Sequence, residues 1–294
     1  MTIAPEAPVP LRFLSLELTA RCQLSCPSHC YAQAGPSGGH GSMSVADWRR
    51  VVSEAAALGT TTVQLIGGEP LLHPDCVELA EHVLGLGLRA RIYSNLYRVR
   101  AEHWALFAHP LIRLATSYYS DDPVQHDVIT GRPGSHAATR GNIIEAVRRG
   151  VEVAVGIVDL GGGQRVEPAR AEMEALGVHQ VRVDRVRAVG NAAPGAAAPS
   201  VSSLCGRCGD QKAAILPDGR VTPCEIGRFL NAGTVAKGSS LAAVLSGRRW
   251  AEVTARVPHR ASADPCAPEC APADDSQCGP ENSGPCGPVG DGDL

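Results

Sequence analysis

The sequence is poor in aromatic residues and has no long apolar run. Phe, Trp and Tyr make up 4% of the 294 residues, so a core must be built mainly from Leu, Val, Ile and Ala. No apolar stretch reaches the roughly 18–20 residues that a membrane-spanning helix needs. The opening residues, MTIAPEAPVP, lack the basic and apolar segments of a secretory signal, so we expect a cytoplasmic protein without membrane association.

Charge is also limited. Charged residues are 19% of the chain and the formal net charge is −3, which argues against a basic nucleic-acid-binding protein and against an acidic disordered chain. With 44% hydrophobic residues, the chain can form one large domain, or a domain with a smaller unit.

Cysteine, in contrast, is abundant, with eleven residues. Without an export signal the compartment is reducing, so metal binding or redox chemistry is favoured over a disulfide framework. Cys76 stands alone and is expected to be a small buried apolar residue. The other cysteines form three groups: Cys22, Cys26 and Cys30; Cys205, Cys208 and Cys224; and Cys266, Cys270, Cys278 and Cys286.

Apolar patterning predicts strands that alternate with helices over residues 11–190. Such alternation favours a parallel sheet covered by helices, and both an open doubly wound sheet and a barrel fit it. We expect strands over 11–18, 61–67, 88–95, 111–119, 151–160 and 178–186, and helices over 45–59, 73–87, 101–109, 135–150 and 166–177.

The remaining third of the chain has a different character. Residues 191–203 are small and rich in Pro and Gly, which indicates a linker. A hairpin over 213–223, turning at Pro217-Asp218-Gly219, and a helix over 240–256 follow. The tail at 265–294 has no apolar periodicity and cannot form a conventional core.

The first cysteine group directly follows the first predicted strand. Three thiolates from one short loop can hold three irons of a cubane cluster, leaving the fourth iron open to a small molecule. A zinc site with His29 as fourth ligand is an alternative. A redox disulfide is a weaker alternative, because three residues separate Cys22 from Cys26 and Cys26 from Cys30, whereas redox pairs have the spacing Cys-x-x-Cys.

Together with Gly67-Gly68-Glu69-Pro70, this cysteine loop resembles the radical S-adenosylmethionine (radical SAM) superfamily. In that family three cysteines after the first strand bind a 4Fe–4S cluster, and a GGEP-type motif after the second strand contacts the SAM amino group. The resemblance implies these roles here, with glycines that admit close backbone approach and a carboxylate for an ammonium group. The chain departs from the family in one respect: an extra residue lies around Pro27-Ser28, between Cys26 and Cys30.

Other segments extend the resemblance over roughly residues 11–190. Ser94 and Asn95 resemble a Thr-Asn-Gly motif near the SAM ribose, with Leu96 in place of Gly, and Ser117 is a candidate SAM contact. Residues 117–135 resemble the corresponding region of peptide-modifying members. Taken singly, Asn95 and Ser117 are equally well explained by ordinary loop chemistry. Four further residues could line a cavity: Tyr118, Tyr119, Asp121 and Arg132.

The family fold is a partial (β/α)6 barrel with ligands at the carboxyl ends of its strands. We therefore expect a barrel over 1–195 and a small, Cys-rich C-terminal extension over 196–294. Cys208, Gly219 and Cys224 resemble the opening of a SPASM or twitch module, which binds an auxiliary iron–sulfur cluster. The alternative for Cys205, Cys208 and Cys224 is a structural zinc knuckle, and the alternative for the tail is a disordered segment rich in Cys, Pro and Gly. The implied auxiliary ligands are Cys205, Cys208 and Cys224, joined by Cys266 and Cys270.

The resemblance implies an enzyme that reductively cleaves SAM to a 5′-deoxyadenosyl radical and abstracts hydrogen from a ribosomally made peptide. Cross-linking, thioether formation or epimerisation would follow. The implied partners are a peptide with a leader, a separate leader-binding protein, and a reductant such as flavodoxin or ferredoxin. The alternatives are a radical SAM enzyme acting on a small molecule or another protein, a zinc-stabilised binding protein without catalysis, and an electron carrier that does not use SAM.

Overall fold

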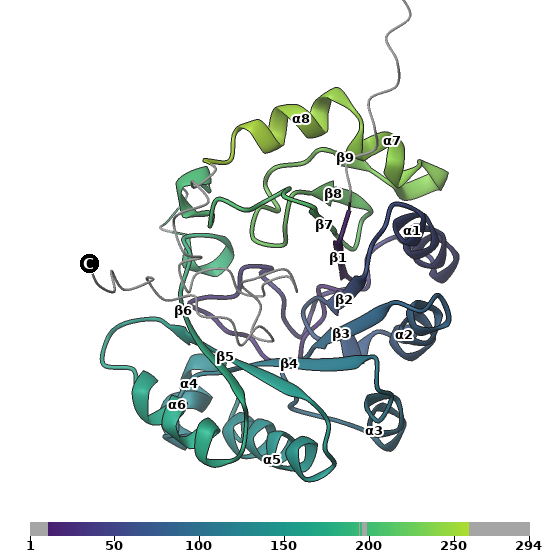
Figure 1. The fold of residues 1–294 in the computed structure, drawn as a ribbon. Helices are drawn as coiled ribbons and strands as arrows, with labels where there is room; N and C mark the ends of the chain where they lie inside the picture. Colours follow the sequence, from purple (N-terminus) through teal and green to yellow (C-terminus); the bar gives the residue numbers. More distant parts are fainter. Residues whose placement is uncertain (1–10, 194, 196–198, 259–294) are drawn as a thin grey trace, which may run out of the picture.

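The computed structural model describes residues 11–193, 195 and 199–258. Its centre is a curved sheet of parallel strands, with helices covering the outer face (Figure 1). The parallel strands that alternate with helices along the chain are β1 (Phe13–Glu17), β2 (Thr62–Ile66), β3 (Arg89–Tyr93), β4 (Ile112–Tyr118), β5 (Val153–Asp159) and β6 (Gln180–Arg185).

These strands form a partial barrel. Their order in the sheet is β6-β5-β4-β3-β2-β1, and each neighbouring pair is parallel. In the described part of the chain β1 and β6 do not pair with each other, because β1 has β7 (Lys212–Ile215) as its other neighbour. The predicted α/β fold is confirmed. Because β1 and β6 are not paired with each other within the described residues, the barrel is partial and not closed.

The helices arise from ordinary local signals. Helix α1 begins after Ser44, whose hydroxyl accepts from the backbone of Asp47 while the Asp47 carboxylate accepts from the Ser44 backbone. Its buried side chains, which include Trp48, face the core. The barrel helices are α1 (Val45–Ala57), α2 (Cys76–Gly85), α3 (Ala101–Phe107), α4 (Pro123–Thr130), α5 (Ser135–Arg148) and α6 (Val166–Ala175), with a 3₁₀ turn η1 (Pro70–Leu72).

Helix α4 is absent from the sequence prediction. It begins at Pro123, directly after the capping residue Asp122, whose carboxylate accepts from the Gln125 backbone. It ends at Thr130, before Gly131 in the left-handed region. Cys76, at the start of α2, is 1% exposed and packs in the main core, so its prediction as a buried apolar residue is confirmed.

The C-terminal segment continues the same sheet. Strands β7 and β8 (Arg220–Thr222) form the predicted hairpin, and β9 (Gly233–Thr234) pairs with β8. The single helix predicted over 240–256 is wrong: Gly247 is extended, and it separates α7 (Leu241–Leu245) from α8 (Arg248–Ala255). Three 3₁₀ turns complete the segment: η2 (Gly190–Ala192), η3 (Val201–Ser203) and η4 (Ala236–Gly238).

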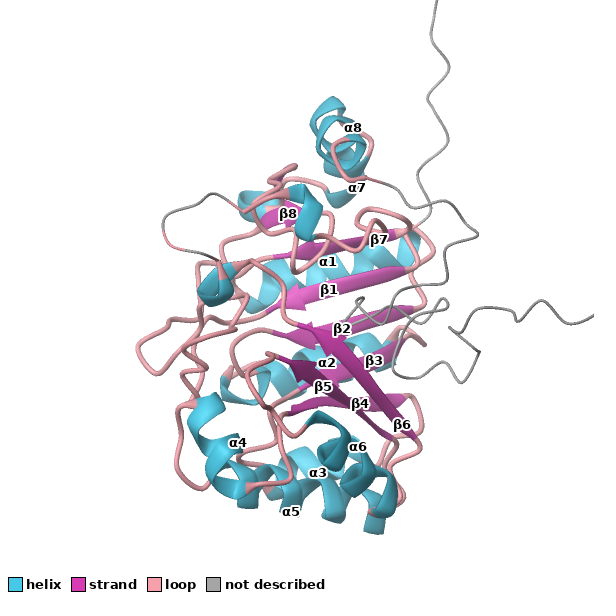
Figure 2. Ribbon diagram, turned by 90° about the vertical axis from the view of Figure 1, so that its left-hand side faces the viewer, coloured by secondary structure: helices cyan, strands magenta, loops and turns pink. Residues whose placement is uncertain are grey.

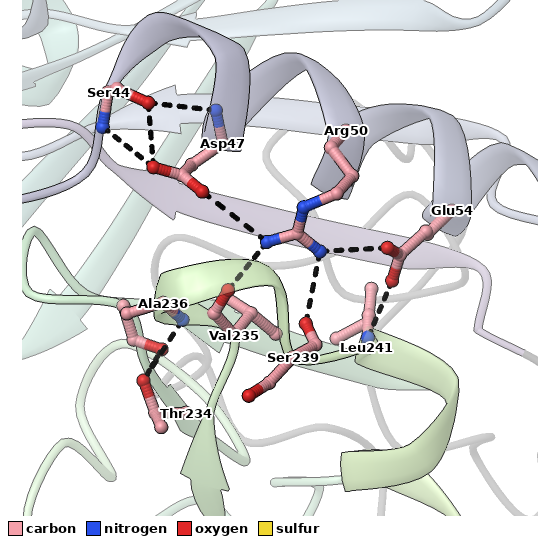
Figure 3. A network of polar contacts seen from close by, with 10 residues as sticks. Ser44, Asp47, Arg50, Glu54, Thr234, Val235, Ala236, Ser239 and Leu241 are labelled. Carbon is pink, nitrogen blue, oxygen red and sulfur yellow. Dashed lines mark hydrogen bonds and ion pairs between the residues drawn. The ribbon is translucent and has the colours of Figure 1, made fainter.

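Figure 2 shows α7 and α8 beside β7 and β8 at one end of the molecule, and α4, α5 and α6 at the other. A network of hydrogen bonds from the Arg50–Glu54 ion pair of α1 joins the C-terminal segment to this helix (Figure 3). Arg50 pairs with Glu54 at 2.8 Å and donates to the carbonyls of Val235 and Ser239, while Glu54 accepts from the Leu241 backbone at 2.6 Å.

The division at residues 195/196 stays a prediction. Cys266, Cys270 and the rest of the tail predicted to lack a core, 265–294, lie outside the described residues. None of the helices in the described ranges combines the length and apolar character that crossing a bilayer requires.

Candidate functional site

A cavity lies at the carboxyl ends of the parallel strands. Its volume is about 1120 Å³, counting the space at its open mouth. Side chains from every strand end of the barrel contribute to its wall, which places residues distant in sequence around one space. The residues with predicted roles that line it are Cys22, Cys26, Cys30, Gly67, Gly68, Asn95 and Ser117, together with Tyr119 from the candidate cavity residues.

The turn after Cys26 absorbs the extra residue of the cysteine loop. The backbone N–H of Cys30 donates to the Cys26 carbonyl at 3.3 Å, so one turn of backbone spans the two cysteines. Cys26 itself has φ +41°, a left-handed conformation that is uncommon outside glycine. The Thr130 carbonyl at the end of α4 stabilises it by accepting from both Ser25 and Cys26, each at 3.0 Å.

Two of the three thiol sulfurs accept hydrogen bonds. Cys22 Sγ accepts from the backbone of Leu24 at 3.4 Å and from Asn95 Nδ2 at 3.5 Å, and Cys30 Sγ accepts from the backbone of Ala34 at 3.3 Å. Burial raises the pKa of Cys22 to about 12 and also raises the pKa of Cys26 and Cys30. The thiols are therefore protonated without metal, and loading a metal must displace their protons.

A cluster and a single zinc ion make different demands on these three thiols. In a cubane each thiolate binds a different iron, so the three sulfurs need not converge on one point. A structural zinc ion needs four ligands around one centre. Within the part of the chain that the structure describes, no three His, Cys, Asp or Glu side chains are arranged to hold a single metal ion. His29, the candidate fourth zinc ligand, instead packs its ring 4.7 Å from that of Tyr119.

Glu69 is near the cavity but does not line it. Its side chain is 1% exposed, with one carboxylate oxygen accepting from the Leu71 backbone at 3.1 Å and the other from the Asn95 backbone at 2.8 Å. Burial raises the pKa of Glu69 to about 7, although these hydrogen bonds and one from Ser94 oppose the rise. Glu69 thus joins the ends of β2 and β3. The SAM contacts of Glu69, Pro70 and Ser94 stay predictions.

Gly67 and Gly68 admit a close approach of the chain's own backbone. A Cβ on Gly67, which has φ +153°, would lie 2.5 Å from the Thr19 carbonyl oxygen. A Cβ on Gly68 would lie 2.4 Å from that of Arg21, the residue before Cys22. Hydrogen bonds from Gly68 N to Thr19 O (2.7 Å) and from Glu69 N to Arg21 O (2.9 Å) complete the contact. The glycine pair therefore supports the start of the cysteine loop.

The second cysteine group gathers at the β7–β8 hairpin. Cys208 Sγ and Cys224 Sγ lie 2.7 Å apart, and both side chains are buried. Hydrogen bonds with Cys205 and Cys224, together with burial, raise the pKa of Cys208. The hairpin thus brings the thiols together as the spacing predicts, while their role as cluster ligands stays a prediction.

The other candidate cavity residues act elsewhere. The Tyr118 hydroxyl contacts His136 Nε2 and donates to Glu172, both at 2.7 Å, and Asp121 pairs with Arg165. Arg132 donates to Tyr97. The contacts of Tyr118 join β4 to α5 and α6, and the Asp121–Arg165 ion pair joins the segments that precede α4 and α6.

A buried ion pair beneath the cysteine loop was missed by the sequence analysis. Glu17, at the end of β1, is fully buried and lies 3.0 Å from Arg228, whose guanidinium lies over the Tyr31 ring. Burial raises the pKa of Glu17 to about 7, opposed by Arg228. The signal in the sequence is a lone carboxylate inside the apolar run LSLEL.

The raised pKa of Glu17 predicts a pH-dependent stability. Folding favours the protonated form of Glu17. Its contribution to the free energy of unfolding is therefore complete below pH 4.5, the ordinary pKa of a Glu side chain, and is lost as pH rises through about 7. Gln is neutral at every pH. The free energy of unfolding of the wild type, minus that of Glu17→Gln, should therefore fall by on the order of 3 kcal/mol from pH about 4.5 to about 8, measured by urea unfolding of the apoprotein.

Glu145→Gln is the matched control. Hydrogen bonds from Arg148 and Arg149 lower the pKa of Glu145 to about 2, so its contribution is lost only as pH falls from 4.5 towards that value. This variant should follow the wild-type curve between pH 5 and 8. A Glu17→Gln curve parallel to that of the wild type would contradict the prediction.

Comparisons with known proteins identify a family and relatives of this chain. The radical SAM superfamily matches residues 16–174, more than half of the chain. The PqqA peptide cyclase of Rhodopseudomonas palustris is 33% identical over 137 residues, which are 46% of this chain and 36% of that protein. The PqqA peptide cyclase of Ruegeria pomeroyi is 35% identical over 158 residues, 53% of this chain and 42% of that protein. The chain thus spans less than half the length of these relatives.

Solved structures share the fold. Streptococcus suis SuiB bound to the precursor peptide SuiA superposes with a TM-score of 0.69 over 82% of this chain and 66% of that chain, at 14% identity. The structure of anSMEcpe with bound AdoMet and the Cp18Cys peptide gives 0.64 over 86% of this chain and 84% of that chain, at 12% identity.

Proposed function

Because the chain belongs to the radical SAM superfamily, we propose that it uses SAM and a 4Fe–4S cluster to abstract a hydrogen atom from a ribosomally made peptide. One observation carries the proposal: Cys22, Cys26 and Cys30 line a single cavity at the strand ends together with Gly67 and Gly68. The curated relatives are peptide cyclases, and SuiB, which shares the fold, is bound to a precursor peptide. These relatives support the peptide as substrate class.

The cysteine loop would hold the cluster through its three thiolates. When bound, the cluster and SAM supply the one-electron chemistry that generates the 5′-deoxyadenosyl radical. The protein provides the surroundings: backbone N–H groups of Leu24 and Ala34 donate to the sulfurs, and the mostly apolar cavity wall limits water around the reacting groups. Gly67, Gly68, Asn95 and Ser117 would contact SAM.

The proposal extends to the C-terminal segment. Cys205, Cys208 and Cys224 would hold an auxiliary iron–sulfur cluster, with Cys266 and Cys270 as further candidate ligands. The substrate would carry a leader bound by a separate protein, and a flavodoxin or ferredoxin would supply electrons. Cross-link formation, thioether formation and epimerisation are the candidate outcomes on the peptide.

Anaerobic turnover tests the proposal. The protein is reconstituted with iron and sulfide and given SAM, dithionite and the short peptides encoded beside its gene. We expect formation of 5′-deoxyadenosine that increases with one peptide, and a changed mass of that peptide. Bound zinc without iron and sulfide, or intact SAM in an iron-loaded sample, would contradict the proposal.

A further inference from the structure

We propose that His126 is a further SAM-binding residue of this cavity, where its Nε2 atom accepts a hydrogen bond from an N–H or O–H group of SAM. The inference rests on the proposed function. His126 lies on α4, is 1% exposed, and lines the cavity. Its Nε2 atom is buried and has no hydrogen-bond partner among the described residues. A buried ring nitrogen in this state is costly unless a ligand partners it.

The neighbours of His126 determine which ring nitrogen carries the proton. Ser135 Oγ lies 2.9 Å from a carboxylate oxygen of Asp127 and 3.2 Å from His126 Nδ1. Although burial raises the pKa of Asp127, hydrogen bonds from the His136 and Gly134 backbones bring it below its ordinary value. The ionised carboxylate can only accept, so the Ser135 hydroxyl donates its proton to Asp127.

His126 Nδ1 must therefore be the donor to Ser135 Oγ. The same hydroxyl lies 2.6 Å from Thr130 Oγ1, whose own proton also has the carbonyl oxygens of His126 and Asp127 as acceptors, at 3.1 and 3.2 Å. With the proton on Nδ1, Nε2 keeps a lone pair that no described residue partners, on a ring that lines the cavity. Burial, reinforced by the charge of His136, lowers the pKa of His126 to about 4, so the ring is neutral near pH 7. A neutral ring does not repel the cationic sulfonium and ammonium groups of SAM.

The ring is held beside the rings of Tyr118 and Tyr119, on a helix whose end contacts the cysteine loop. Its centroid lies 5.0 Å from that of Tyr118 and 5.6 Å from that of Tyr119. The same helix ends at Thr130, whose carbonyl binds the backbone of Cys26. A ligand that reaches Nε2 therefore also lies beside the cysteine loop, which is where SAM would bind the open iron. This placement favours SAM over the peptide as the source of the donor.

Equilibrium binding tests the proposal without turnover. SAM is titrated into the cluster-loaded, unreduced holoenzyme. The affinity should weaken about tenfold in His126→Leu, and His126→Gln, which restores an acceptor near Nε2, should recover most of it. The matched control is His103→Leu, which removes a buried histidine of α3 outside the cavity lining and should leave SAM affinity unchanged. Iron and sulfide contents are measured for each variant.

Imidazole ¹⁵N NMR of the wild-type apoprotein gives a second readout that needs no variant. We expect the Nδ1–H tautomer at pH 7, and a shift of the Nε2 resonance when SAM is added to the cluster-loaded protein. Unchanged SAM affinity in His126→Leu, an Nε2–H tautomer, or an effect confined to peptide affinity would overturn the proposal. If the wild type itself neither binds nor cleaves SAM, the proposed function fails instead.

Discussion

A variant with alanine at Cys22, Cys26 and Cys30 should cleave no SAM above background and should lose about four iron atoms per chain. The three thiols line one cavity, and two of them accept backbone hydrogen bonds that would stabilise bound thiolates. Iron bound by the second cysteine group, at the β7–β8 hairpin, should remain. The measurements are 5′-deoxyadenosine formation and the iron and sulfide content of the reconstituted protein.

Cys76→Ala is the control for this variant. Cys76 is more buried than any of the three thiols and packs in the main core at the start of α2, so its replacement should cost stability of about 1 kcal/mol and spare SAM cleavage. Undiminished cleavage in the triple variant would refute the assignment of the cysteine loop.

Gly68→Ala should lower both cluster content and SAM affinity. The new methyl group would lie 2.4 Å from the Arg21 carbonyl oxygen and 2.9 Å from Ala34 Cβ, so the start of the cysteine loop must move. Overpacking of this kind costs about 1–3 kcal/mol of stability. The checks are iron content after reconstitution, SAM binding and the midpoint of thermal unfolding.

The chain offers a glycine that should behave in the opposite way. Gly141 lies inside α5, and a Cβ there would meet no atom within 4 Å. Gly141→Ala should therefore stabilise the protein by about 0.5–1 kcal/mol and leave iron content unchanged. Wild-type iron content and SAM affinity in Gly68→Ala would mean that the cysteine loop does not depend on this contact.

The sequence predicts the barrel well because its strands are apolar runs and its long helices have one apolar face. Helix α4 escapes this reasoning. It has eight residues, and its two valines, Val124 and Val128, are 72% and 70% exposed, so no apolar stripe marks it. Only Asp122, Pro123 and Gly131 indicate its ends. The helix predicted over 240–256 fails for the opposite reason, since its apolar pattern continues across the break at Gly247.

The sequence likewise predicts one part of the candidate site and misses another. Short motifs locate the cysteine loop and the glycine pair, because both depend on residues close in sequence. The pairing of Glu17 with Arg228 joins residues 211 positions apart, and no local pattern specifies it. The environment of Glu69 is equally non-local: its carboxylate is occupied by the Asn95 backbone, which arrives from the next strand. Motif reasoning therefore finds the residue and misses its contacts.

The pairing of β1 with β7 has a consequence for biosynthesis. β1 precedes the other described strands of the sheet in the sequence, yet its second neighbour, β7, is made only after all six barrel strands. Until then the nascent chain displays an apolar strand with an unpaired edge, which is a template for wrong pairing. Because β7 covers this edge of β1 so late, we expect chains truncated before Lys212 to aggregate more readily than the full chain.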